Sequence, residues 1–164
     1  MKHTISILCD DIPGVMTRIS GLFSRRGFNI ESLTVGRTEL SGKSRFTIVV
    51  NGDDRTLEQV RKQLQKLVHV IKVWDLDHER IVEREHALIK IEAQNGDQAA
   101  LLQAITALQA RIVDSSGPVW VLEITGDTAS VDSAISLFGR FTILESIRTG
   151  KIALERGNRT PGGL

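Results

Sequence analysis

The chain has 164 residues, of which 41% are apolar and 25% charged, proportions typical of a folded globular protein. Its 21 basic and 20 acidic side chains leave a formal charge of +1, so no basic field points to nucleic acid. No run approaches the roughly 18 apolar residues of a membrane span, and we expect no signal peptide. The single cysteine, Cys9, lies in an apolar stretch, which predicts a buried thiol and a reducing, cytoplasmic compartment.

The first half of the chain predicts a strand, a helix, two strands, a helix and a strand. Residues 3–9 alternate between apolar and polar side chains with the period of a strand, and this period changes after Pro13 and Gly14. Apolar residues then fall on one helical face through residues 15–23, and the helix is expected to end near Gly27. Strands are predicted at residues 28–35 and 46–50, a helix at 57–67 and a strand at 68–76.

The second half repeats this order of periods, which indicates an internal duplication. A charged stretch at residues 75–86 is interpreted as the linker between the two copies. The predicted elements of the second copy are a strand at 87–93, a helix at 99–108, two strands around a turn at 115–118, a helix at 130–138 and a strand at 141–154. The predicted domains are therefore residues 1–77 and 78–155, followed by a glycine-rich, flexible tail at 156–164.

The order of elements in each half predicts a four-stranded antiparallel sheet with two helices on one face. We therefore expect an α+β protein made of two tandem ferredoxin-like βαββαβ domains. In this fold the second strand lies at a sheet edge, and in the first half that strand has no proline or lysine to block pairing. The sequence thus predicts a homodimer that joins these edges across a two-fold axis.

The turn DDIPGV, at residues 10–15, is the first candidate for a ligand site. The glycine lets a ligand approach the backbone, where the free N–H groups of Gly14, Val15 and Met16 can donate to a carboxylate. Asn29 is the second candidate, because its amide can meet both charged groups of an amino acid if a dimer brings it opposite this turn. Each feature also has a purely structural interpretation, as a proline-glycine turn and as an asparagine that bonds its own backbone.

Several runs of the sequence closely resemble the regulatory small subunit of acetolactate synthase. They are PGVMTRISGLFSRRGFNIESLTVG (13–36), SRFTIVV (44–50), LEQVRKQLQKLVHVIKV (57–73), VERE (82–85) and RTGKIALER (148–156). The resemblance implies an N-terminal ACT domain that binds a feedback amino acid, usually valine, between two subunits and activates the large catalytic subunit. It also implies a second, ACT-like domain at the C-terminal side.

Carried over position by position, the resemblance also implies a set of site residues. These are Asp11, Ile12, Pro13, Gly14, Val15, Asn29 and Gly36, with Gln59 as a weaker candidate. Thiamine diphosphate, magnesium and flavin are expected on the large subunit, and no cofactor is expected on this chain. Family members often have asparagine where this chain has Asp11, and the extra carboxylate weakens binding of a ligand carboxylate unless it meets the ligand ammonium.

Other charged residues give weaker signals. Arg18, Arg25 and Arg26 form a basic cluster that is either a solvated helix face or a contact for the large subunit. His78 and His86 lack a metal-binding spacing, and no catalytic motif is present, so we expect neither a metal site nor an enzyme. Two alternatives remain open: a stand-alone ACT-domain sensor that acts on another protein, such as a transcription factor, and an enzyme in its own right.

Overall fold

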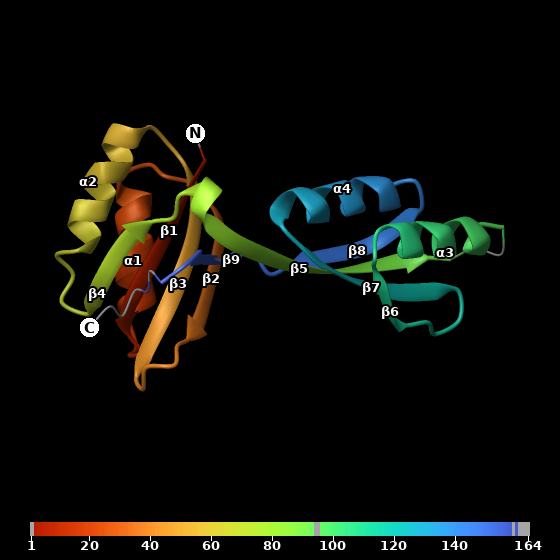
Figure 1. Cartoon of the computed structure of the whole chain (residues 1–164), viewed down its shortest axis with the longest axis horizontal. Helices are drawn as coiled ribbons and strands as arrows, with labels where there is room; N and C mark the ends of the chain where they lie inside the picture. The colour runs from red at the N-terminus through yellow and green to blue at the C-terminus, as the bar shows by residue number, and fades with distance from the viewer. Residues whose placement is uncertain (1, 94–95, 159, 161–164) are drawn as a thin grey trace. The chain divides into compact units, whose positions relative to one another are not determined.

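The structure, a computed structural model, describes residues 2–93, 96–158 and 160. The chain forms two compact units, one that runs to Val82 and is joined by the segment from Ile152, and one that spans Glu83–Lys151. Each unit is a β-sheet with two helices on one face (Figure 1). No helix within the described residues is long and apolar enough to cross a membrane. The predicted flexible tail spans residues 156–164, and of these residues 159 and 161–164 lie outside the described residues.

The first unit has the predicted ferredoxin-like order of elements. It contains β1 (Lys2–Asp10), α1 (Val15–Arg25), β2 (Ile30–Arg37), β3 (Lys43–Asn51), α2 (Asp54–Leu64) and β4 (Val70–Asp75). Its strands lie in the order β2-β3-β1-β4, and every neighbouring pair is antiparallel. The prediction that the second strand lies at a sheet edge is confirmed.

The core of the first unit lies between the sheet and its helices. Val15, Ile19 and Phe23 are buried on α1 at intervals of four residues, because one stripe of a helix faces the sheet. Alternate residues of β1 meet them, and among these the predicted buried thiol of Cys9 is confirmed, with no exposed surface. Burial of a large apolar side chain contributes about 1.5–3 kcal/mol. Because these side chains must face the helices, the core fixes the register in which the strands of the first sheet pair.

The second unit repeats the topology of the first, as predicted. It contains β5 (Ile81–Glu92), α3 (Gln98–Ala107), β6 (Arg111–Asp114), β7 (Val119–Gly126), α4 (Thr128–Phe138) and β8 (Thr142–Arg148). Its strands lie in the order β6-β7-β5-β8. Ile89 and Ile91 of β5, Leu122 of β7 and Phe138 of α4 are fully buried in its core. The two units therefore have separate hydrophobic cores of the same design.

The predicted linker is wrong from Ile81 onwards, where β5 begins instead. Ile81, Glu83 and Glu85 are buried on alternate positions of this strand. The buried carboxylates are paired, since Lys151 Nζ lies 2.7 Å from Glu83 and Arg148 makes two hydrogen bonds to Glu85 at 2.9 and 2.7 Å. Glu83 and Glu85 can therefore be buried, because Lys151 and Arg148 at the end of the same unit neutralise their charges.

The predicted final strand is two strands, separated by Gly150 with a φ of +77°. The second, β9 (Ile152–Glu155), pairs with β5, and the N–H of Arg156 donates to the carbonyl of Arg80 at 2.7 Å. The structure consequently divides the chain between residues 82 and 83 instead of 77 and 78. It also assigns residues 152–155, predicted for the second domain, to the first unit.

Candidate functional site

The connection between β1 and α1 leaves the start of the helix open. Gly14 precedes the first helical residue in a left-handed conformation, with φ of +86°, and provides no side-chain cap. The first helical hydrogen bond runs from the N–H of Arg18 to the carbonyl of Gly14, at 3.2 Å. The N–H groups of residues 15–17 consequently have no acceptor within the helix, as at every helix start. The first turn also carries no acidic side chain that competes for them.

Apolar side chains surround this loop on the surface. Ile12 is 43% exposed and Met16 51%, while Val35 at the edge strand is 43% exposed. Pro13 and Gly14 are exposed as well, whereas the side chain of Val15 is buried in the core. Val15 can therefore contact a ligand only through its backbone amide, and not through its side chain. The loop offers hydrogen-bond donors next to apolar surface, which suits a small ligand with a carboxylate and an apolar body.

Asp11 and Asp10 are held by side chains from other segments of the first unit. The carboxylate of Asp11 accepts a hydrogen bond from Arg37 Nε at 3.2 Å, and its N–H donates to the carbonyl of Gly42 at 2.9 Å. Asp10 contacts Lys43 Nζ at 2.5 Å and His69 Nδ1 at 3.1 Å. Hydrogen bonds from Lys43, and then from His69, lower the pKa of the Asp10 carboxyl. Arg37 thus offsets the extra negative charge that Asp11 adds beside the loop.

Gly36 lies near the end of β2, whereas Asn29 directly precedes the start of that strand. Arg37 pairs with Ser44 of β3, which in turn pairs with Cys9, so Gly36 and Arg37 lie at the end of the sheet that carries the loop. Ile30 pairs with Val50, the partner of His3, and Asn29 therefore precedes the opposite end. One chain consequently brings Gly36 to the side of the loop and leaves Asn29 about 23 Å away, at about 3.3 Å per strand residue.

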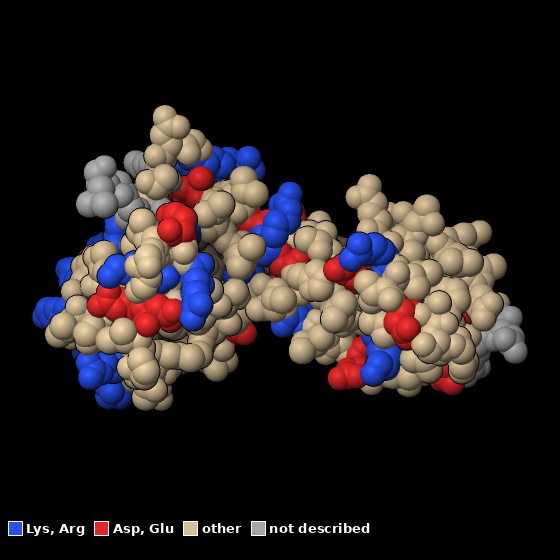
Figure 2. All heavy atoms as spheres, turned by 90° about the horizontal axis from the view of Figure 1, so that it is seen from below, with Lys and Arg blue, Asp and Glu red and all other residues tan. Residues whose placement is uncertain are grey.

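The remaining predicted residues are exposed on the helices. Gln59 lies in the middle of α2, and Arg18, Arg25 and Arg26 lie on α1 or directly after it. None of the ion pairs among the described residues includes one of these three arginines. Figure 2 shows basic and acidic side chains interspersed over the visible face. Charge on that face therefore does not single out a docking surface.

In the described part of the chain, no three metal-ligating side chains gather around the histidines of the charged stretch or elsewhere. His86 Nε2 lies 2.7 Å from Glu123 Oε1, which also contacts Arg111 Nη2 at 2.5 Å. Hydrogen bonding to His86, followed by the charge of Arg111, lowers the pKa of Glu123. The acidic side chains near His86 thus belong to ion pairs that stabilise the second sheet.

Comparisons with known proteins agree over most of the chain. Residues 5–72 match the model of the AHAS small subunit-like ACT domain, and residues 84–157 match that of the small subunit of acetolactate synthase. A probable acetolactate synthase small subunit from Archaeoglobus fulgidus is 49% identical over 97% of this chain and 99% of its own length. The acetolactate synthase small subunit from Mycobacterium bovis is 44% identical over 98% of this chain and 95% of its own length.

A solved structure is similar over the same length. The crystal structure of the acetolactate synthase small subunit from Thermotoga maritima matches with a TM-score of 0.89 and 42% identity, over 97% of this chain and 99% of that one. Both halves of the sequence, the curated relatives and the fold thus point to one family. The chain belongs to the family of acetolactate synthase small subunits and carries an ACT domain in its first half.

Proposed function

We propose that this chain activates the catalytic large subunit of acetolactate synthase and makes it sensitive to valine, which binds where two copies of the chain meet. Binding of the free chain favours the active state of the large subunit. Valine at the junction favours an arrangement that activates less, so the ligand acts by shifting a conformational equilibrium. The chemistry itself belongs to the large subunit, with its thiamine diphosphate, magnesium and flavin.

The open helix start at Gly14 supports the carboxylate half of this site. The helix dipole alone contributes about 0.3–1 kcal/mol, whereas a Kd of about 1 mM already requires about 4 kcal/mol. Backbone donors and a second wall must supply the rest. Ile12, Met16 and Val35 provide exposed apolar surface on one side of the loop, but a single copy leaves the other side open.

The observation that carries the proposal is the separation of Gly36 and Asn29 along the exposed edge strand β2. If the β2 strands of two copies pair antiparallel about a two-fold axis near Ser32 and Leu33, each Asn29 comes beside Gly36 of the other copy. The amide then faces the loop from the second chain and can meet both charged groups of the amino acid. A complete site thus requires a dimer.

The function is tested by measuring acetolactate formation by the large subunit with and without this chain, across a series of valine, leucine and isoleucine. We expect the chain to raise the rate and valine to reverse the rise. A rate that does not respond to the chain would refute the partnership. Light scattering at micromolar concentration tests the dimer separately, and a monomer there would refute the junction.

The location of the ligand is tested by Gly14→Asp, which introduces a negative charge at the carboxylate position. We expect valine sensitivity to be lost while activation remains, because the loop is exposed and the core is untouched. Gly117→Asp is the matched control, since Gly117 also has a positive φ, of +64°, with open space around it, but lies in the second unit. A Gly14→Asp variant that stays fully sensitive to valine would exclude the loop.

The coupling itself is reciprocal. If valine weakens activation by changing the contact with the large subunit, the large subunit must change the affinity for valine by the same factor. Titration calorimetry of valine into the chain, alone and in complex, measures this factor. Equal affinities in the two titrations would reject this form of the mechanism.

A further inference from the structure

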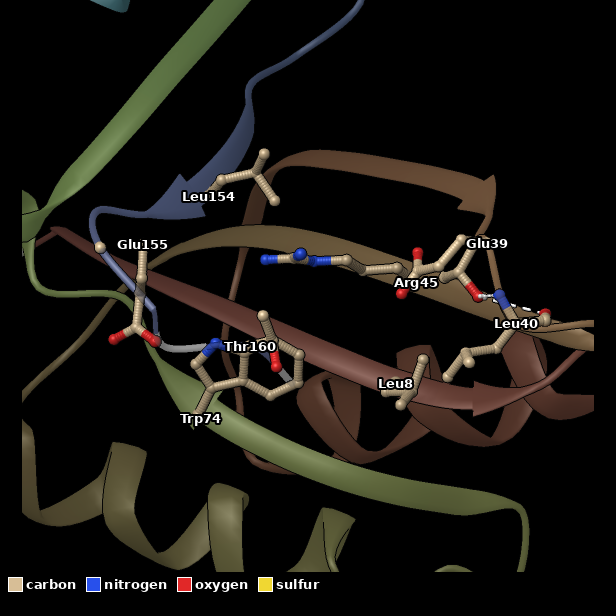
Figure 3. Close-up of a pocket in the computed structure, with 10 residues that line it drawn as sticks. Leu8, Glu39, Leu40, Arg45, Trp74, Leu154, Glu155 and Thr160 are labelled. Atoms are coloured by element: carbon tan, nitrogen blue, oxygen red, sulfur yellow. Dashed lines mark hydrogen bonds between the residues drawn. The ribbon is translucent and has the colours of Figure 1, made fainter. Parts of the chain in front are cut away.

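A pocket of about 260 Å³ lies on the face of the first sheet that α1 and α2 do not cover (Figure 3). Leu8 and Arg45 point to this face because their neighbours in the strands, such as Ile7 and Phe46, point into the helical core. Trp74 of β4 and the segment of β9 complete the walls. All of these residues belong to the first unit, so the pocket is formed within one chain.

Arg45 is fixed in the middle of this pocket. Its Nε donates to the hydroxyl of the fully buried Ser6, and one Nη donates to the carbonyl of Ala153, both at 2.8 Å. The guanidinium also lies 5.1 Å from the centroid of the Trp74 ring. A guanidinium has five N–H donors, and these two hydrogen bonds engage two of them. The group is therefore oriented in advance and retains donors for an acceptor in the pocket.

Two carboxylates also line the pocket. Glu39 and Glu155 lie on opposite sides of the Arg45 guanidinium (Figure 3). Burial lowers the pKa of Arg45, and the charges of Glu39 and Glu155 oppose this change, which shows that both carboxylates act on the guanidinium. A simple anion is attracted by one group and repelled by two, and a simple cation experiences the reverse. A small zwitterion can place its negative group at the guanidinium and its positive group at a carboxylate.

The size and the walls of the pocket limit the ligand further. The volume is just below the roughly 300–1,000 Å³ of sites for drug-sized molecules, which fits a small metabolite. Leu8, Trp74 and Leu154 offer apolar surface on both sides of the guanidinium. Leu154 is 62% exposed, so an apolar body that covers its side chain gains by removing it from water.

We propose that this pocket binds a free α-amino acid with a small apolar side chain, whose carboxylate meets Arg45 and whose ammonium meets Glu39 or Glu155. The side chain of the ligand packs on Leu8 and Trp74. The site lies within one protomer and is separate from the loop at Gly14. It does not depend on the function proposed above.

The test uses Trp74 as a local probe in the full-length chain. The chain contains two tryptophans, so Trp120→Phe leaves Trp74 as the only one. Gly14→Asp is added to disable the loop site, and L-leucine is titrated while Trp74 emission is recorded. We expect a saturable change, and its absence up to about 20 mM, well above a millimolar Kd, would overturn the proposal. A change that occurs only when Gly14 is intact would also overturn it.

Charge variants test how the ligand is recognised. Glu39→Gln is expected to weaken leucine binding about tenfold and to tighten binding of 4-methylpentanoate, the same molecule without the ammonium group. Glu155→Gln should act in the same direction, while Glu79→Gln, an exposed glutamate of the same unit outside the pocket, should change neither affinity. An unchanged ratio of the two affinities in both pocket variants would show that no ammonium is recognised there and would overturn the proposal.

Discussion

Replacement of Lys151 by methionine should strongly destabilise the second unit. Lys151 Nζ lies 2.7 Å from Glu83 Oε2, and the two side chains are only 11% and 8% exposed. The other oxygen of Glu83 accepts a hydrogen bond from the N–H of Thr128, at 3.4 Å. Methionine keeps most of the apolar stem but leaves the carboxylate buried without a counter-ion. Removal of one partner from a buried pair costs about 3–5 kcal/mol, a large part of the 5–15 kcal/mol that stabilises a typical domain.

Urea unfolding measures this loss, with Trp120 of the second unit as the probe in a Trp74→Phe background. Lys90→Met is the matched control, because Lys90 pairs with Glu145 at 3.0 Å on the surface, where the side chains are 43% and 67% exposed. That change should cost no more than about 1 kcal/mol. The double variant Glu83→Gln with Lys151→Met should recover most of the loss, since neutral glutamine needs no counter-ion.

The same ion pair also predicts in which direction stability changes with pH. Burial raises the pKa of Glu83, but the hydrogen bond and charge of Lys151, with help from Thr128, outweigh it, so the net pKa is lowered. The stabilisation from this pair is therefore complete above the unfolded pKa, about 4.3, and is lost as pH falls through the lower folded pKa. Without Lys151, burial dominates and protonation stabilises the fold. A loss below about 1 kcal/mol at pH 7, or a difference that does not shrink on acidification, would refute this account.

Two further predictions concern the first unit. Gly52→Ala should lower the free energy of unfolding by about 1–3 kcal/mol, because a Cβ there would collide with the Phe28 ring, while Gly36→Ala, in open space, should have little effect on urea unfolding. Burial, followed by the charges of Asp10 and Asp11, raises the pKa of the Cys9 thiol to about 11, so a thiol reagent at pH 8 should label Cys9 only in denaturant. Rapid labelling of the native chain would contradict its burial.

Local periodicity was sufficient to predict the elements and the sheet order of the first unit. The stripe of Val15, Ile19 and Phe23 predicts α1, and the structure begins that helix at the residue after Gly14. The edge position of β2 follows from the order of elements, because few topologies are compatible with short connections and right-handed crossovers. These features depend on neighbours in sequence, which a single chain displays directly.

Contacts between distant segments could not be predicted in this way. Arg45 and Ala153 are 108 residues apart, and no local pattern indicates that the segment of β9 returns to the first unit. The pocket around Arg45 was missed for that reason. The start of β5 could not be predicted for another reason: Ile81, Glu83 and Glu85 have the period of a strand, but charged side chains at two of these three positions are also typical of a solvated linker. A buried charge is unfavourable only until its partner is known, and the partners lie more than 60 residues later.

The two units share one topology but differ at the start of the first helix after the first strand. In the first unit that position is Gly14, which has no side chain and leaves the helical N–H groups accessible. In the second unit it is Asp97, whose carboxylate makes no capping hydrogen bond and places negative charge at the helix start. Because the dipole attracts one anion there, Asp97 competes with any ligand carboxylate. The edge strand of the second unit, β6, is also only four residues long, against eight in β2. The duplication thus preserved a way of packing a sheet against two helices, while the uncapped glycine at the helix start and the long edge strand are features of the first unit and not of the second.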